Sequence, residues 1–301
     1  MKKIFSLALL LGFLTTISNA QIRLNYNLDQ NTNYSSNVVL KQGISQTAMG
    51  QTQNIDNDQG FGITITVNGL DAESYKLNMV YNSIMINSPM VGLSYDSKTA
   101  TTEPTGAAKA IAAIVGTEFN FQLNKDGSIE NITGVEAMLD TMVTNMGITD
   151  EAQATAFKAQ MSGQYNAETI KDQMKRTIIV YPDKELNKGD TWSADESVTV
   201  PFSMNIQTTY ELADYNDDTA TINVTSDIFS EGGELTTGGT TMTPDLSGVQ
   251  SGTIVIDRKT GLIISSNMEQ LITGVMNMTS PAEMEIPMEI SGTSTTEGAI
   301  N

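Results

Sequence analysis

The chain has 301 residues, contains no cysteine and no histidine, and carries 35 acidic against 16 basic residues, a formal net charge of −19. The missing side chains exclude Ser-His-Asp and Cys-His nucleophiles as well as ordinary zinc and type 1 copper sites. The acidic balance disfavours nucleic acids and anionic membrane surfaces as partners, because both attract basic patches.

The first 20 residues show the order of features of a secretory signal peptide. Two lysines precede an apolar run over 4–14, which is too short to span a bilayer because a span needs about 20 apolar residues. The small residues Ser18 and Ala20 predict cleavage between Ala20 and Gln21. The alternative, a buried N-terminal helix or strand, does not explain this order.

Cleavage would remove two lysines and no acid, leaving 14 basic and 35 acidic residues and a net charge of −21. The chain lacks the cysteine that carries the lipid of a bacterial lipoprotein, and no later segment is apolar enough to cross a membrane. We therefore expect a mature protein, 21–301, that is soluble in the periplasm or outside the cell and has no membrane anchor.

Residues 21–133 are predicted to form mainly strands. A hairpin is expected around the turn-rich link 68–71, because apolar residues alternate with polar ones on both of its sides: Ile63, Ile65 and Val67, then Tyr75, Leu77, Met79 and Tyr81. A second hairpin is expected around 124–127, and a short alanine-rich helix over 107–115.

Residues 134–176 are predicted to form a helical block. One apolar stripe at helical spacing predicts an amphipathic helix that ends near Gly147: Val135, Met138, Leu139, Met142, Val143 and Met146. Thr149 is expected to cap a second helix that buries Phe157 and Met161, and Asn166 to cap a third.

Residues 178–301 are again predicted to form strands. In the last of them Met284, Ile286, Met288 and Ile290 alternate with polar residues, and Pro287 predicts an edge strand because it cannot donate a ladder hydrogen bond. The order of turns resembles that of the first region, and the segment from Leu186 to Trp192 corresponds to the segment from Leu28 to Tyr34. This shared order predicts two related halves, although any two β-rich segments share turns and alternation.

Acidic residues offer only weak candidates for a metal site. Asp56 and Asp58 lie near one predicted hairpin, and Asp217 and Asp218 near another. Calcium prefers such oxygens, but ordinary turns require the same residues, so we assign no metal and no cofactor. Thioethers bind Cu(I), yet the methionines near the C-terminus are interpreted as core residues in a chain without histidine or cysteine.

A hydrophobic ligand is the binding partner that the methionines favour. The cavity that would hold it, between a curved sheet and the helices, would be lined by Val135, Met138, Leu139, Met142, Met146 and Trp192. The alternative is plain packing of these residues, with Trp192 anchoring a strand as Tyr34 does in the first half.

The stretch 181–184, Tyr-Pro-Asp-Lys, followed by Lys-Gly-Asp-Thr-Trp at 188–192, is similar to a pattern in an uncharacterised family of exported bacterial proteins, many of them lipoproteins. The turn 124–127 and the methionine-rich helical block extend the resemblance over nearly all of the mature chain. The resemblance implies no activity and no catalytic residue. A half-barrel like that of periplasmic lipoprotein carriers is the fold suggested by analogy.

The expected fold is α+β, with long curved antiparallel sheets from two related halves, 21–133 and 178–301, and the helical block packed on them. The first functional hypothesis is a non-enzymatic envelope protein that binds a lipid or acyl chain. The second is a structural protein that engages another envelope protein. The third, a carboxylate-dependent hydrolase, requires paired acids in a cleft, and we assign no catalytic residue.

Overall fold

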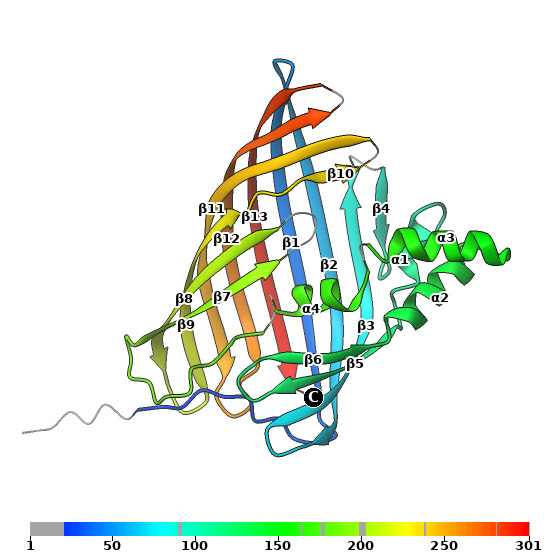
Figure 1. Ribbon diagram of the computed structural model, residues 1–301. Coiled ribbons are helices and arrows are strands. Elements are labelled where there is room, and N and C mark those ends of the chain that lie inside the picture. Colours follow the sequence, from blue (N-terminus) through cyan, green and yellow to red (C-terminus); the bar gives the residue numbers. More distant parts are fainter. Residues whose placement is uncertain are drawn as a thin grey trace, which may run out of the picture.

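The computed structural model describes residues 21–89, 92–163, 165–175, 178–198, 203–237, 239–280 and 282–300, so the predicted cleavage residue Ala20 and the rest of the predicted signal peptide lie outside them. Figure 1 shows long strands that form a curved wall. The strands of the first half are β1 (Asn33–Ala48), β2 (Gln51–Leu70), β3 (Ser74–Ser88), β4 (Leu93–Asp96), β5 (Glu118–Asn124) and β6 (Ile129–Thr133). Those of the second half are β7 (Thr191–Val198), β8 (Met204–Tyr215), β9 (Thr219–Ser230), β10 (Leu235–Thr237), β11 (Thr240–Asp257), β12 (Ile263–Ser280) and β13 (Met284–Ile300).

All these strands belong to one antiparallel sheet of 13 strands, in the order β6-β5-β3-β2-β1-β13-β12-β11-β9-β8-β7, with β4 beside β3 and β10 beside β11. Each half is a meander, and the two halves meet where β1 pairs with β13. That pairing runs from Tyr34 opposite Ile300 to Gln46 opposite Met288. The outermost strands of this order, β6 and β7, are neighbours in sequence and are connected through the helical segment.

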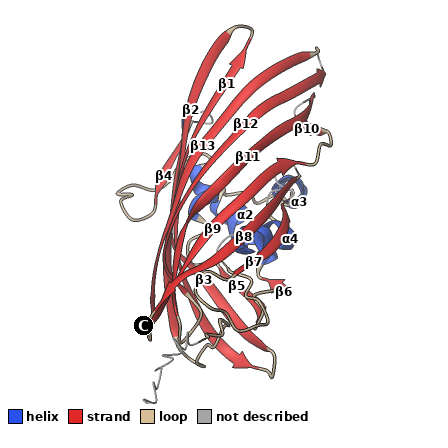
Figure 2. Ribbon diagram, turned by 90° about the vertical axis from the view of Figure 1, so that its left-hand side faces the viewer, coloured by secondary structure: helices blue, strands red, loops and turns tan. Residues whose placement is uncertain are grey.

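The expected α+β architecture, with a helical block packed on sheets from two halves, is wrong. The long pairing of β1 with β13 merges the strands of both halves into a single sheet. In the described chain the helices are short: α1 (Ala108–Ala112), α2 (Val135–Asn145), α3 (Glu151–Met161) and α4 (Ala167–Lys175). Helix α3 buries none of its residues, so Phe157 and Met161 are only partly buried. Figure 2 shows the helices as a small group beside a dominant, curved sheet.

Most local predictions about the helices are confirmed. Asn166 caps α4 by accepting a hydrogen bond at 2.9 Å from the backbone N–H of Thr169. Gly147 follows α2 with a φ of 71°, the left-handed conformation that suits the end of a helix. The cap of α3 is Asp150 and not Thr149, because the Asp150 carboxylate accepts from the N–H of Gln153.

The predicted hairpins around 68–71 and 124–127 are confirmed as β2–β3 and β5–β6. The prediction that 284–290 forms an edge strand is wrong, since β13 lies between β1 and β12. Pro287 lies just beyond the pairing of β13 with β1, which stops at Met288, and it is paired only with Val275 of β12. The backbone nitrogen of Pro287 is therefore not needed by the β1 ladder.

The two faces of the sheet differ in polarity. On β13, for example, Ile290 and Thr296 are buried on the inner, concave face, while Glu289 and Glu297 are exposed on the outer face. Inner-face residues and α2 form one large buried cluster toward the end of the sheet where β13 ends. A second, smaller cluster lies nearer the start of β13 and includes Leu246, Met276 and Ile290. Within the described ranges, no helix has the length and apolar character needed to cross a membrane.

Candidate ligand-binding cavity

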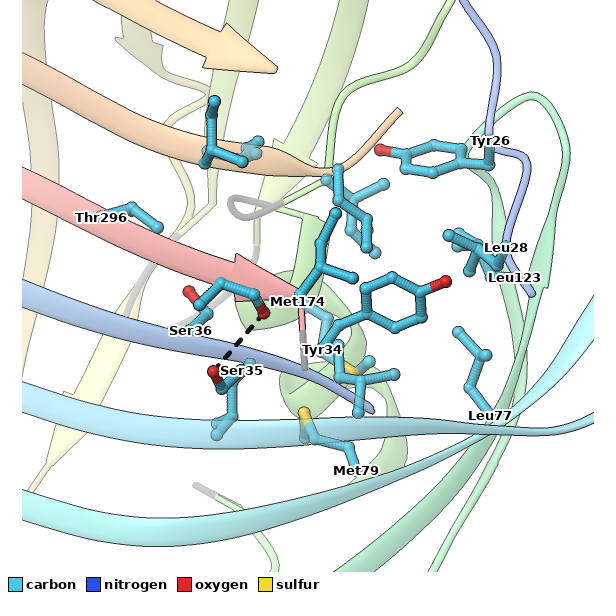
Figure 3. A pocket seen from close by; sticks show the side chains of 18 of the residues that line it. Tyr26, Leu28, Tyr34, Ser35, Ser36, Leu77, Met79, Leu123, Met174 and Thr296 are labelled. Atoms are coloured by element: carbon cyan, nitrogen blue, oxygen red, sulfur yellow. Dashed lines mark hydrogen bonds between the residues drawn. The ribbon is translucent and has the colours of Figure 1, made fainter. Parts of the chain in front are cut away.

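An apolar cavity of about 80 Å³ lies where β1, β12 and β13 meet the segment that precedes β1 (Figure 3). Its wall includes residues of both halves of the sheet and of α4. The lining residues are Tyr26, Leu28, Tyr34, Ser35, Ser36, Ile63, Ile65, Leu77, Met79, Phe121, Leu123, Met174, Ile178, Leu262, Ile263, Ile264, Thr296, Ala299 and Ile300. The cavity thus belongs to the large buried cluster and lies at the junction of the two halves.

Strand register places the apolar side chains of the wall next to one another. Tyr34 of β1 is opposite Ile65 of β2, and Ile65 is opposite Met79 of β3. Because successive side chains of a strand point to opposite faces, residues two apart, such as Ile63 and Ile65, face the cavity together. Met174 of α4 completes this side, where it lies near Tyr34 and Met79 in Figure 3.

The segment preceding β1 closes the cavity. Ile22, Leu24, Tyr26 and Leu28 are all buried, while the residues between them are exposed. Ile22 forms a two-way backbone bridge with Leu186. This alternation is that of a strand with one buried face, although the segment is outside the named strands.

Tyrosine hydroxyl groups hold this closing segment in place. The Tyr26 hydroxyl forms hydrogen bonds with the backbone of Ile179, and the Tyr75 hydroxyl donates a hydrogen bond to the Tyr26 carbonyl oxygen at 3.0 Å. The Tyr181 hydroxyl donates to the carbonyl oxygen of Gly261 at 2.6 Å. The rings of Tyr26 and Tyr181 lie 5.1 Å apart, centroid to centroid. The closing segment is therefore tied to residues from both halves of the chain.

No charged side chain is among the residues that line the cavity. Burial raises the pKa of the Tyr26 hydroxyl well above its ordinary value, so this group stays protonated at neutral pH. The other hydroxyl groups of the wall belong to Tyr34, Ser35, Ser36 and Thr296. Such a wall suits an uncharged, mainly apolar ligand.

The residues predicted to line a cavity lie elsewhere in the structure. Val135, Met138, Leu139 and Met142 of α2 are buried in the large cluster, and Met146 is partly buried against it. Trp192 is buried and stacks on Tyr210 with ring centroids 5.3 Å apart. None of these residues is among those that line the cavity around Tyr26.

The acidic candidates for a metal site are spread over turns and outer strand positions. Asp56, Asp217 and Asp218 are exposed, and Asp58 is half-buried. The backbone N–H of Asp218 donates to the Asn216 side chain at 2.8 Å, which is an ordinary turn contact. Among the described residues, no group of three acidic side chains could hold a metal ion.

Sequence reasoning missed the closing segment, which begins directly after the predicted cleavage site. Gln21, at that site, is exposed. The signal was present as apolar residues at alternate positions from Ile22 to Leu28. The remaining lining residues come from strands and a helix that are distant in sequence, so no local pattern connects them.

A model of a protein family of unknown function, DUF6263, matches residues 72–263. No curated protein matches the chain. The matched range covers β3 to the start of β12, and thus strands of both halves together with all four described helices.

Three solved structures are similar over most of this chain. A structure of lipovitellin, titled for its lipid–protein interactions, is 12% identical with a TM-score of 0.45 over 91% of this chain, which spans only 26% of the length of lipovitellin. An outer membrane channel from Pseudomonas putida F1 is 8% identical with a TM-score of 0.23, and covers 91% of this chain and 97% of its own. OmpF of Salmonella typhi in complex with daunomycin is 7% identical with a TM-score of 0.24, and the similarity covers 92% of this chain and 100% of the OmpF chain. Scores of this size are too low to carry a conclusion about this chain.

Proposed function

The chain belongs to the family of unknown function DUF6263, and we propose that it is an exported, non-enzymatic protein of the cell envelope that binds a hydrophobic ligand. The ligand is a lipid or another molecule with an acyl chain, and its apolar end enters the cavity closed by Tyr26. Export rests on the sequence of residues 1–20 and ligand binding on the cavity.

The observation that carries this proposal is the uncharged lining of the cavity. Its wall is built from aliphatic, aromatic and methionine side chains with a few hydroxyl groups. Burial of hydrocarbon in such a site is favourable by about 0.8 kcal/mol for each CH₂ group removed from water. A charged headgroup, in contrast, would lose its hydration there without gaining a partner of opposite charge.

The volume limits what the cavity can hold. Its 80 Å³ is less than the roughly 150 Å³ of an engineered apolar cavity that binds benzene. The cavity therefore holds the end of a chain and not a whole lipid, unless its walls move. Ile300, which lines the cavity, is 45% exposed, so the remainder of the ligand would leave past the end of β13.

The hydrolase hypothesis receives no support from the site. Glu285 and Glu289 are exposed on the outer face, and Asp217 and Asp218 lie in an exposed turn. Carboxylates that act as paired acid and base work within a cleft beside the substrate. For this reason the proposed function is binding and not catalysis.

Ligand binding is tested by native mass spectrometry of protein purified from the periplasm of its own host. We expect a fraction of the protein to carry an additional mass of lipid size that organic extraction removes. The matched variants are Thr296→Leu, which adds bulk on the buried cavity wall, and Thr295→Leu, which adds the same bulk on the exposed outer face.

We expect T296L to lose most of the bound mass and T295L to retain it, with both variants giving the circular dichroism spectrum of the native protein. Wild-type protein without any adduct, together with no displacement of a fluorescent fatty acid by added lipids, would overturn the proposal. Equal ligand loss in both variants would also contradict the proposed location.

A second candidate function, engagement of another envelope protein, is favoured by one feature of the outer face. Val249 of β11 and Leu271 of β12 are directly opposite each other and are 52% and 46% exposed. A V249D/L271D variant should lose a partner that crosslinks to native protein in the envelope. An unchanged crosslinking pattern would remove this candidate.

A further inference from the structure

Three methionines form a row across adjacent strands at the end of the concave face that lies farthest from the cavity. Met242 of β11 is directly opposite Met278 of β12, and Met278 is directly opposite Met284 of β13. In directly opposite positions of antiparallel strands, side-chain Cβ atoms are about 4.5–5.5 Å apart. The register thus places three thioether groups side by side.

The alternation of side chains along each strand shows that the row of methionines faces inward. Met278 is two residues from Met276, which is 6% exposed, and Met284 is two residues from Ile286, which packs on the second buried cluster. Met242 also packs on that cluster. Because this face is concave, long side chains from neighbouring strands converge above it.

The row is neither fully buried nor fully exposed. Met242, Met278 and Met284 each have intermediate exposure, whereas the core methionines Met138 and Met142 are 1% and 0% exposed. The next positions along the same face are Pro244, Met276 and Ile286, which form an apolar floor under the row. This floor would shield a bound ion from water, and the ion would enter the site from the opposite, more exposed side.

The chemistry of the row selects a soft cation. Thioethers are neutral, polarisable ligands that favour Cu(I) over Mg²⁺, Ca²⁺ or Mn²⁺, which prefer oxygen. The chain contains no histidine and no cysteine that would compete for such an ion. Glu285, the nearest acid along β13, belongs to the opposite face and is exposed.

We propose that Met242, Met278 and Met284 form a binding site for a soft monovalent cation, Cu(I) or its redox-inert analogue Ag(I). The site is separate from the cavity near Tyr26, so its presence or absence is independent of the proposed lipid binding. Only binding is proposed, with no change in the oxidation state of the ion.

The test is a titration of full-length mature protein with Ag(I), followed by calorimetry, and with Cu(I) under anaerobic reducing conditions in competition with a chromophoric chelator. We expect one equivalent of either ion to bind. X-ray absorption of the Cu(I) complex should show a sulfur-only first shell. Leucine is the replacement for each methionine, because Met and Leu have similar volumes and such exchanges preserve packing.

Met278→Leu, which removes the central ligand, should weaken Ag(I) binding at least tenfold, and the triple variant M242L/M278L/M284L should abolish it. The control is Met49→Leu, which replaces a methionine that is 90% exposed in the turn between β1 and β2 and should leave binding unchanged. The proposal fails if wild-type protein binds neither ion, if M278L binds as tightly as wild type, or if nitrogen or oxygen ligands dominate the Cu(I) shell.

Discussion

The hydroxyl group of Tyr26 makes two hydrogen bonds with the backbone of Ile179: it donates to the carbonyl oxygen at 3.1 Å and accepts from the N–H at 3.0 Å. Tyr26 and Ile179 are 2% and 1% exposed, so water cannot replace either bond. This pair ties the segment before β1 to the chain that follows α4, 153 residues away.

Replacing Tyr26 with phenylalanine should therefore destabilise the protein by about 1–3 kcal/mol, the usual cost of leaving buried backbone polar groups without partners. Urea unfolding followed by circular dichroism measures the change in the free energy of unfolding. Tyr95→Phe is the control, because the described residues provide no hydrogen-bond partner for the Tyr95 hydroxyl. A urea midpoint of the Y26F variant equal to that of the wild type would contradict a stabilising role of the Tyr26 hydroxyl group.

Alkaline pH should weaken the fold through its buried tyrosines. Burial raises the pKa of Tyr81 to about 12, and it also raises the pKa values of Tyr26 and Tyr181. In the unfolded chain these groups ionise near the ordinary value of 10.0, so their contribution to stability is complete below that pH. As pH rises from there toward the folded-state values, the unfolded state is increasingly favoured.

The measurement compares urea midpoints at about pH 8 and about pH 11, together with the tyrosinate absorbance at each pH. Because the chain has no cysteine, thiol ionisation cannot contribute to the absorbance change. Complete ionisation of all tyrosines near pH 10 while the far-ultraviolet spectrum stays native would refute the prediction.

Gly252 of β11 should not tolerate a side chain. A Cβ atom at this position would lie 2.1 Å from the carbonyl oxygen of Asn267 and 2.8 Å from the Cα of Met268 on β12. Gly252→Ala should cost about 1–3 kcal/mol, because the paired backbones must separate. Gly69→Ala is the control, since its Cβ would be 3.5 Å from the flexible side chain of Lys76. If the thermal unfolding temperatures of both variants equal that of the wild type, the predicted clash at Gly252 is rejected.

Trp192, the single tryptophan of the chain, should report on the packing of β7. Its ring stacks on Tyr210, and its indole N–H donates to the carbonyl oxygen of Val180 at 2.9 Å. Trp192→Phe should lower stability by about 1–3 kcal/mol through the lost hydrogen bond and the smaller ring. Tyr210→Phe keeps the stacked ring and should cost less, and an equal or greater loss in Y210F would contradict this explanation.

Local patterns in the sequence were sufficient to predict strands and hairpins. The alternation around Ile63 and Tyr75 fixes which residues face inward, and this follows from the geometry of a strand. It does not fix which strand lies beside which. The pairing of Tyr34 with Ile300 joins residues that lie far apart in the sequence, and the prediction of sheets from two halves with helices packed on them failed at this point.

The candidate cavity was less accessible to sequence reasoning. Met138 and Met142 are at helical spacing and were predicted to line a cavity, but the same pattern describes a helix face packed in a core, where the structure places them. The lining residues Tyr26, Met174 and Ile263 come from a closing segment, a helix and a strand that only the tertiary structure brings together. Whether the two halves arose by duplication remains a prediction.

The position of β13 between β1 and β12 has a consequence for the order of folding. The ribosome makes β13 after all the other described strands. The edges of β1 and β12 that pair with β13 must therefore stay unpaired until β13 has been made. Pairing between ends so distant in sequence is slow to form, because a long loop has to close first. The pairing of β1 with β13, which joins the two halves into one sheet, is therefore expected to be a late step of folding.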